Sequence, residues 1–119
     1  MNLLVFGENG QLASELQVNC PREICPTFVG RRKYDLVNAD GIFRLFQKYK
    51  PDCVINAAAF TDVDQSELNI SFARKINAVV PKFIANEAKK RNIPYIHIST
   101  DYVFNNSDID SINELAAPN

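Results

Sequence analysis

The chain has 119 residues, of which 46% are hydrophobic and 23% are charged, and its formal net charge is −1. These proportions are typical of a globular domain rather than a disordered chain, and the length suits one domain with its own core. A net charge so close to zero gives no electrostatic reason to expect nucleic acid or an anionic membrane as a partner. Any anion that the chain binds must therefore be held by local geometry.

The composition also disfavours disulfide and metal chemistry. The three cysteines, Cys20, Cys25 and Cys53, are odd in number and form no CxxC pair. His97 is the only histidine, so a metal site would be short of nitrogen ligands, and no metal-binding residues are assigned. The N-terminus has no signal-peptide pattern, and no apolar run approaches the roughly 20 residues of a membrane span. The sequence predicts a soluble, cytoplasmic protein with reduced thiols.

The first part of the chain predicts a strand, a helix and a second strand. Residues 3–6 form a continuous apolar run, which is typical of a strand buried on both faces of a parallel sheet. A turn follows, and residues 11–17 carry apolar side chains at helical spacing until Pro21 and Pro26 break the pattern. Residues 27–29 are the second expected strand.

The middle of the chain predicts a short third strand at residues 34–37, followed by a helix. Asn38 or Asp40 is the expected N-cap of this helix, which carries apolar residues at helical spacing. It ends near Lys50, because a proline follows. Residues 53–55 form a fourth expected strand.

The next segment predicts one long helical region at residues 70–91 and then a fifth strand at residues 95–98. Pro81 lies within the helical region. Because proline lacks an amide donor, we expect a kink or two consecutive helices, with Pro81 in the first turn of the second. The expected inward stripe of this region consists of Phe72, Ile76, Phe83, Ile84 and Ala88.

The alternation of strands and helices predicts an α/β fold, with a parallel sheet and helices on both faces. The expected fold class is a Rossmann-type doubly wound sheet. Residues 1–119 would form the N-terminal half to two-thirds of one NAD(P)-binding domain.

A glycine-rich turn, Gly7-x-x-Gly10-x-x-Ala13, lies between the first expected strand and the first expected helix. Gly7 permits a tight turn, Gly10 lets backbone amides approach a pyrophosphate, and Ala13 lets the helix lie close to the sheet. The exposed amides and the positive helix end would then hold the anion without a net positive charge. A plain strand–helix turn is the alternative.

Arginines rather than a carboxylate follow the second expected strand. NAD-selective sites place an acidic residue there to accept the ribose hydroxyls, but Gly30 is followed by Arg31, Arg32 and Lys33, and no carboxylate occurs before Asp35. The planar guanidinium fork suits a 2′-phosphate, so NADP is favoured as the cofactor and NAD stays possible. A solvated basic turn is the alternative.

Three further segments carry a resemblance to a known family: residues 56–64 (NAAAFTDVD), Asn77 and residues 99–104 (STDYVF). Together with the Gly7 turn they resemble the extended short-chain dehydrogenase/reductases. Within these they are most similar to the dTDP-4-dehydrorhamnose reductase family, in which NAAxTxVD and STDYVF stand at matching places. The resemblance extends from the N-terminus to about Phe104.

The resemblance implies roles for individual residues. Asp35 and Leu36 match the pair that lies beside the adenine. Thr100 matches the catalytic hydroxyl that hydrogen-bonds the substrate carbonyl, and Asp101 matches its substrate-contacting neighbour; a helix cap or turn at Thr100 is the alternative. The remaining cofactor-binding residues would contact the pyrophosphate (Gly7, Gly10, Gln11 and Leu12) or line the nicotinamide side (Ala58, Ala59 and Thr61). Ordinary packing is the alternative for the alanines.

The implied activity is the NADPH-dependent reduction of a 4-keto sugar nucleotide, from dTDP-4-dehydrorhamnose to dTDP-rhamnose. Members of the family use a Tyr-x-x-x-Lys pair to supply the proton, but after Thr100 this chain has only Tyr102 and no lysine. We therefore expect a chain cut before the catalytic helix, without the substrate-binding lobe, with weak or lost NADPH binding and no turnover. Such a cut would expose a sheet edge, so the sequence also allows a homo-oligomer.

Other functions stay open. The chain could be a non-catalytic dinucleotide-binding module that resembles the regulatory subunit of methionine adenosyltransferase. It could also be a truncated gene product without a function of its own, or part of a different extended reductase or epimerase. Whether Tyr-x-x-x-Lys is encoded after Asn119 would separate these readings.

Overall fold

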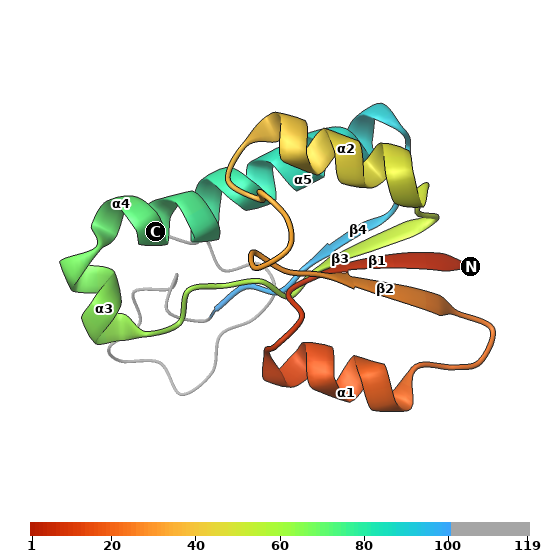
Figure 1. Cartoon of the computed structure of the whole chain (residues 1–119), viewed down its shortest axis with the longest axis horizontal. Helices are drawn as coiled ribbons and strands as arrows, with labels where there is room; N and C mark the ends of the chain where they lie inside the picture. Colours follow the sequence, from red (N-terminus) through yellow and green to blue (C-terminus); the bar gives the residue numbers. More distant parts are fainter. Residues whose placement is uncertain (101–119) are drawn as a thin grey trace, which may run out of the picture.

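The computed structural model describes residues 1–100, apart from the side chain of Val63, and shows a parallel sheet with helices on both faces (Figure 1). Within residues 1–100 the sheet has four strands in the order β2-β1-β3-β4, and all neighbouring strands are parallel. The strands are β1 (Asn2–Phe6), β2 (Cys25–Val29), β3 (Cys53–Asn56) and β4 (Tyr95–His97). This arrangement confirms the predicted α/β fold of the Rossmann type.

Helices cover the two faces of the sheet unequally. Helix α1 (Gln11–Asn19) lies on one face, whereas α2 (Ala39–Tyr49) and α5 (Val80–Lys90) lie side by side on the other (Figure 1). Helices α3 (Val63–Leu68) and α4 (Ile70–Arg74) and the π-helical segment η1 (Lys75–Val79) lead into α5. No helix within residues 1–100 has the length and apolar character needed to cross a membrane.

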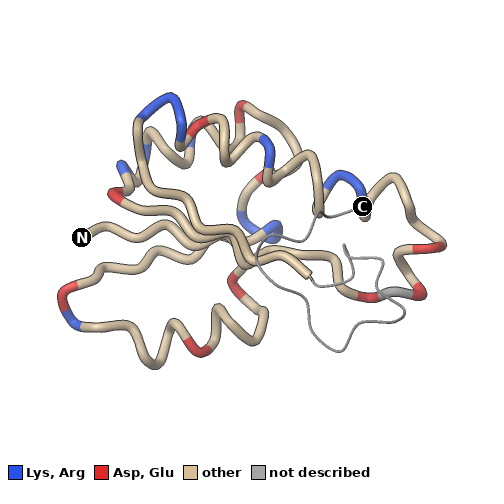
Figure 2. Tube along the Cα trace, turned by 180° about the vertical axis from the view of Figure 1, so that it is seen from behind, with Lys and Arg blue, Asp and Glu red and all other residues tan. Residues whose placement is uncertain are grey.

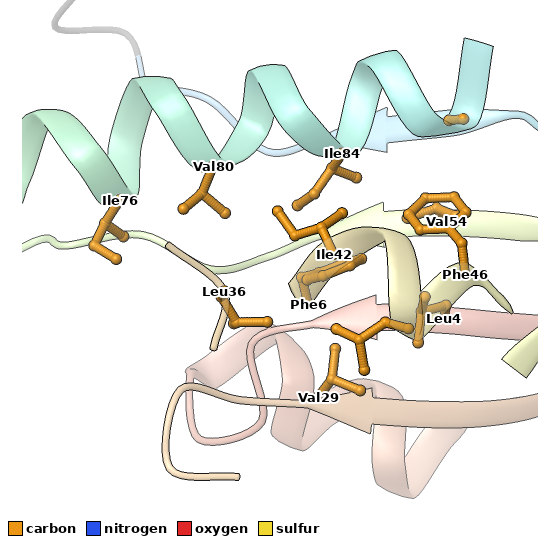
Figure 3. Close-up of a cluster of buried hydrophobic side chains, with 12 residues drawn as sticks. Leu4, Phe6, Val29, Leu36, Ile42, Phe46, Val54, Ile76, Val80 and Ile84 are labelled. Carbon is orange, nitrogen blue, oxygen red and sulfur yellow. The ribbon is translucent and has the colours of Figure 1, made fainter. Parts of the chain in front are cut away.

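The strands carry no charged side chains, and Figure 2 shows the sheet as an uncharged centre with the charges around it. In β1 the four residues from Leu3 to Phe6 are all buried, as expected for a central strand covered on both faces. The main core lies between the sheet and the pair α2 and α5 (Figure 3). It includes Leu4, Phe6, Val29, Leu36, Ile42, Phe46, Val54, Ile76, Val80 and Ile84.

The prediction of a third strand at residues 34–37 is wrong. The segment is instead irregular and follows a turn at residues 31–33. Local groups accept its amides: Tyr34 donates to the carbonyl of Gly30 at 3.2 Å, and Val37 donates to Oδ1 of Asp35 at 3.2 Å. Asn38, one of the two N-caps that the sequence allowed, caps α2 and accepts the Gly41 amide at 2.7 Å.

The second strand begins earlier than expected and contains Pro26, which the sequence pattern indicated as a break. Pro26 is paired in register with Leu3 of β1. Strand β2 lies at the edge of the sheet, where a residue without an amide donor can be accommodated on the unpaired side. The position of β2 at the sheet edge explains why this strand can contain a proline.

The long helical region is divided as Pro81 predicted. Pro81 lies in the first turn of α5, and a π-helical turn joins α4 to α5. The inward stripe is confirmed, with Ile76, Ile84 and Ala88 buried and Phe72 and Phe83 packed against the core. The sequence pattern did not reveal helix α3, which precedes α4.

Candidate functional site

A cavity of about 300 Å³ opens at the carboxyl edge of the sheet, where the loops after β1, β2 and β3 meet. Parallel strands bring their carboxyl ends to one edge, which is where α/β sheets bind ligands. The lining residues come from four segments: Gly7, Glu8, Asn9 and Gly10; Gly30, Arg31, Arg32 and Leu36; Ala57, Ala58, Ala59 and Phe60; and Ile76 and Val80.

Gly7 sets the geometry of the first turn. Its φ of +101° is a backbone conformation that residues with a side chain rarely adopt. A Cβ at this position would also lie 3.0 Å from backbone atoms of Ala57 and Ala58. Its amide donates to the carbonyl of Val29 at 2.9 Å, and the Ala57 amide donates to the carbonyl of Phe6 at 2.8 Å. The turn after β1 is thus pressed against the loop after β3, and only glycine fits between them.

Helix α1 begins at the cavity, because its N-cap, Gly10, belongs to the lining. Gly10 is the N-cap and contributes no side chain, and the first turn of α1 contains no acidic residue that would offset the positive helix end. A Cβ built at Gly10 would meet nothing within 4 Å, so open space lies above this position. Such an arrangement suits a phosphate group held by backbone amides.

Arg31 and Arg32 line both this cavity and a neighbouring one of about 420 Å³. Asp35 and Leu36 also line the second cavity. The two residues predicted to lie beside an adenine are therefore found in the same cavity. The Arg31 guanidinium lies 5.8 Å from the centre of the Phe72 ring. The two cavities are neighbours that share the lining residues Arg31, Arg32, Leu36 and Ile76.

Buried polar groups hold the loop after β3. Asn56 is fully buried, and its Oδ1 accepts the Ala58 amide at 3.2 Å. Its Nδ2 therefore faces Nδ1 of His97 at 3.1 Å as a donor, which makes that ring nitrogen the acceptor. The Tyr95 ring stacks on His97 at 6.1 Å, and burial raises the pKa of Tyr95, an effect that the Asn56 side chain opposes.

Asn77 has a positioning role that the sequence did not reveal. From η1 it accepts the Phe60 amide at 2.8 Å through Oδ1 and donates Nδ2 to the Phe60 carbonyl at 2.9 Å. These two bonds fix the loop that carries Ala58 and Ala59 into the cavity wall. Its place in the family motif was visible, but its partner depends on the approach of two segments 17 residues apart.

Several predicted site residues lie outside the cavity lining. Gln11 and Leu12 begin α1 next to the cavity but do not line it, and Thr61 is exposed beyond Phe60. Thr100 is exposed shortly after β4, whose end is held to β3 by the Ile98 amide donating to the Asn56 carbonyl at 3.1 Å. Asp101 lies outside the described residues. The roles of these residues stay predictions.

Comparison with known proteins gives one family and a set of similar reductases. The family described as the RmlD substrate binding domain matches residues 1–119. The dTDP-4-dehydrorhamnose reductase of Escherichia coli is 39% identical over 112 residues, which cover 87% of this chain and 36% of that protein. The corresponding enzyme of Aggregatibacter actinomycetemcomitans is 35% identical, over 86% of this chain and 35% of its own.

Two solved structures are similar over almost the whole chain. The dTDP-4-dehydrorhamnose reductase of Clostridium acetobutylicum superimposes with a TM-score of 0.93 at 35% identity, covering 100% of this chain and 43% of that chain. The enzyme of Bacillus anthracis, solved in complex with NADP, gives a TM-score of 0.92 at 28% identity, over 99% of this chain and 42% of its own. The chain spans well under half the length of the relatives that it matches.

Proposed function

The chain belongs to the RmlD substrate-binding domain family, and from this membership we propose that it forms the dinucleotide-binding part of a reductase acting on 4-keto sugar nucleotides. NADPH is the proposed cofactor, since a similar reductase is solved with NADP. The similar proteins named dTDP-4-dehydrorhamnose reductases make dTDP-4-dehydrorhamnose the first substrate to test.

The cavity at the carboxyl edge of the sheet is the observation that carries this proposal. It joins the glycine turn from Gly7 to Gly10 at the start of α1 with the guanidinium groups of Arg31 and Arg32. These groups would hold a pyrophosphate and a 2′-phosphate, while the small Ala58 and Ala59 would leave room for the nicotinamide ribose.

The residues of this chain would position the reacting groups. When bound, the nicotinamide would supply the hydride. Thr100 would donate a hydrogen bond to the ketone oxygen of the substrate, stabilising the negative charge that develops there. Asp101 would contact the sugar, and Asn56 and Asn77 would hold the loop behind the nicotinamide. The proton would come from a tyrosine of the Tyr-x-x-x-Lys type, which residues 1–119 do not contain.

We expect residues 1–119 alone to bind NADPH weakly and to show no turnover. A titration of the chain with NADPH and NADH, followed by ligand-observed NMR, tests the binding. The double variant Arg31→Ala, Arg32→Ala should weaken NADPH by about tenfold or more and NADH far less, because only NADPH carries the 2′-phosphate. The matched control is Arg22→Ala, Arg44→Ala, which removes two exposed arginines outside the cavity.

Three results would contradict these expectations. Equal weakening of both dinucleotides by the Arg31 and Arg32 changes would remove the phosphate role assigned to them. Absence of binding of either dinucleotide by the unaltered chain at millimolar concentration would remove the cofactor site itself. Substrate-dependent oxidation of NADPH by residues 1–119 would contradict the expected lack of turnover.

A further inference from the structure

The Glu8 carboxyl group occupies the space where a side chain at Gly30 would begin. A Cβ built at Gly30 would lie 2.4 Å from Cδ and Oε1 of Glu8 and 2.5 Å from its Cγ. Distances this short are incompatible with any side chain at position 30 while Glu8 keeps its place. Glu8 therefore brings a carboxylate from the turn after β1 to the end of β2.

The end of β2 is the position that decides between the two dinucleotides in Rossmann domains. An acidic residue there accepts hydrogen bonds from the ribose 2′-hydroxyl of NAD, whereas an arginine nearby accommodates the 2′-phosphate of NADP. Gly30 directly follows Val29, the last residue of β2, and has no side chain to do either. The Glu8 carboxylate stands in its place, supplied by a different segment.

Glu8 shares the cavity wall with Arg31 and Arg32, so opposite charges line the same place. Within residues 1–100, the ion pairs join Glu87 to its neighbours, and none joins Glu8 to either arginine. The backbone of Glu8 is held by Gln17, whose Nε2 donates to the Glu8 carbonyl at 3.2 Å. The bond from Gln17 holds the Glu8 backbone, and the Glu8 side chain, which forms no ion pair among residues 1–100, belongs to the cavity lining.

We propose that Glu8 is a specificity-determining residue that accepts the ribose 2′-hydroxyl of NADH and opposes the 2′-phosphate of NADPH. It balances Arg31 and Arg32, so the site accepts both cofactors instead of excluding NADH. This inference rests on the proposed function, because it assumes that a dinucleotide occupies the cavity.

The first test measures the dissociation constants of NADPH and NADH for the chain by NMR titration. Glu8→Gln removes the charge but keeps an acceptor, so NADPH affinity should rise about tenfold while NADH changes little. Glu8→Ala removes both charge and acceptor, so NADH affinity should fall as well. Glu15→Gln on the exposed part of α1 is the matched control and should change neither constant.

A transplant tests the position of the carboxylate independently. Glu8→Ala clears the atoms that block Gly30, so Glu8→Ala combined with Gly30→Asp should return a carboxylate to the end of β2 and recover NADH affinity relative to Glu8→Ala alone. Thermal unfolding of each variant would show that the fold is kept.

The outcomes separate the two proposals. NADPH binding that persists with an unchanged NADPH-to-NADH ratio in Glu8→Gln would overturn the role of Glu8 and leave the cofactor site standing. An unaltered chain that binds neither dinucleotide would overturn the cofactor site and the role of Glu8 together.

Discussion

Gly7 and Gly10 belong to the same turn, but the structure gives them different requirements. Gly7 has a φ of +101° and backbone atoms of the β3 loop at 3.0 Å from any added Cβ. Gly10 has neither a positive φ nor an atom within 4 Å of such a Cβ. The fold therefore requires glycine at position 7. At position 10 the fold does not require glycine, and its absent side chain matters only for a ligand that approaches the turn.

Gly7→Ala is expected to destabilise the chain by about 2 kcal/mol, because it combines left-handed strain with a backbone clash. Gly10→Ala is expected to leave the free energy of unfolding nearly unchanged but to weaken NADPH binding, since its methyl group would project into the space proposed for the pyrophosphate. Urea unfolding and NADPH titration of both variants check this pair. Equal stability of the two variants would contradict the assignment of Gly7.

Segment η1 both lines the cavity, through Ile76, and holds a neighbouring loop in place. A π-helical turn interrupts the α-helical pattern between α4 and α5, and such turns are common at functional sites. Asn77 lies in this turn and makes two hydrogen bonds to the backbone of Phe60. The Phe60 and Phe72 rings meet edge to face at 5.3 Å, so the loop is held by both polar and apolar contacts.

Asn77→Ala is expected to lower the free energy of unfolding by about 1 kcal/mol, because two exposed hydrogen bonds to the backbone of Phe60 are replaced by bonds to water. It should also weaken NADPH binding, since Ala58 and Ala59 belong to the released loop. Asn86→Ala, which truncates an exposed asparagine of α5, is the matched control for the loss of an amide side chain. If Asn77→Ala behaved like the control in both measurements, the positioning role would be lost.

At the scale of the whole molecule, a small charged network joins α5 to α2. The Arg91 guanidinium lies 5.2 Å from the Phe46 ring centre and 5.4 Å from that of Phe43, and it is ion-paired with Glu87. Glu87 is buried, and Lys90 Nζ lies 2.7 Å from its Oε1. Burial alone would raise the pKa of Glu87, but the bonds from Lys90 and Arg91 outweigh it and lower that pKa.

A carboxyl group with a lowered pKa in the folded state stabilises the fold above its unfolded pKa, and this contribution disappears as the pH falls through the folded pKa. Glu87→Gln should therefore cost on the order of 1 kcal/mol at pH 7 and progressively less as the pH falls through the lowered pKa of Glu87, because the native carboxyl then protonates too. Urea unfolding across this pH range is the measurement. Glu67→Gln, which alters an exposed residue of α3, is the control, and a Glu87 difference independent of pH would contradict the argument.

The edge of the sheet at β4 bears on the assembly of the molecule. Ile96 and Ile98 remain 50% and 47% exposed at this edge. Exposed apolar side chains beside an edge strand favour association with a further segment or chain. Formation of a homo-oligomer stays a prediction.

The sequence alone determined the features that depend on residues close together along the chain. The apolar run of β1, the helix start at Asn38 and the restart of the helix at Pro81 each depend on residues that are neighbours along the chain. The parallel α/β order and the glycine turn followed in the same way. The strand expected at residues 34–37 does not form, because the Asp35 side chain and the Gly30 carbonyl accept amides of this segment.

Only the tertiary structure decided which distant residues meet. Parallel pairing of β1 and β2 brings Glu8 onto Gly30, and the approach of η1 to the β3 loop joins Asn77 to Phe60. Position in the sheet likewise made Pro26 acceptable, because β2 lies at an edge. Such contacts depend on strand order and register, which arise from burial of the whole core. The spacing of residues along the chain therefore does not predict them.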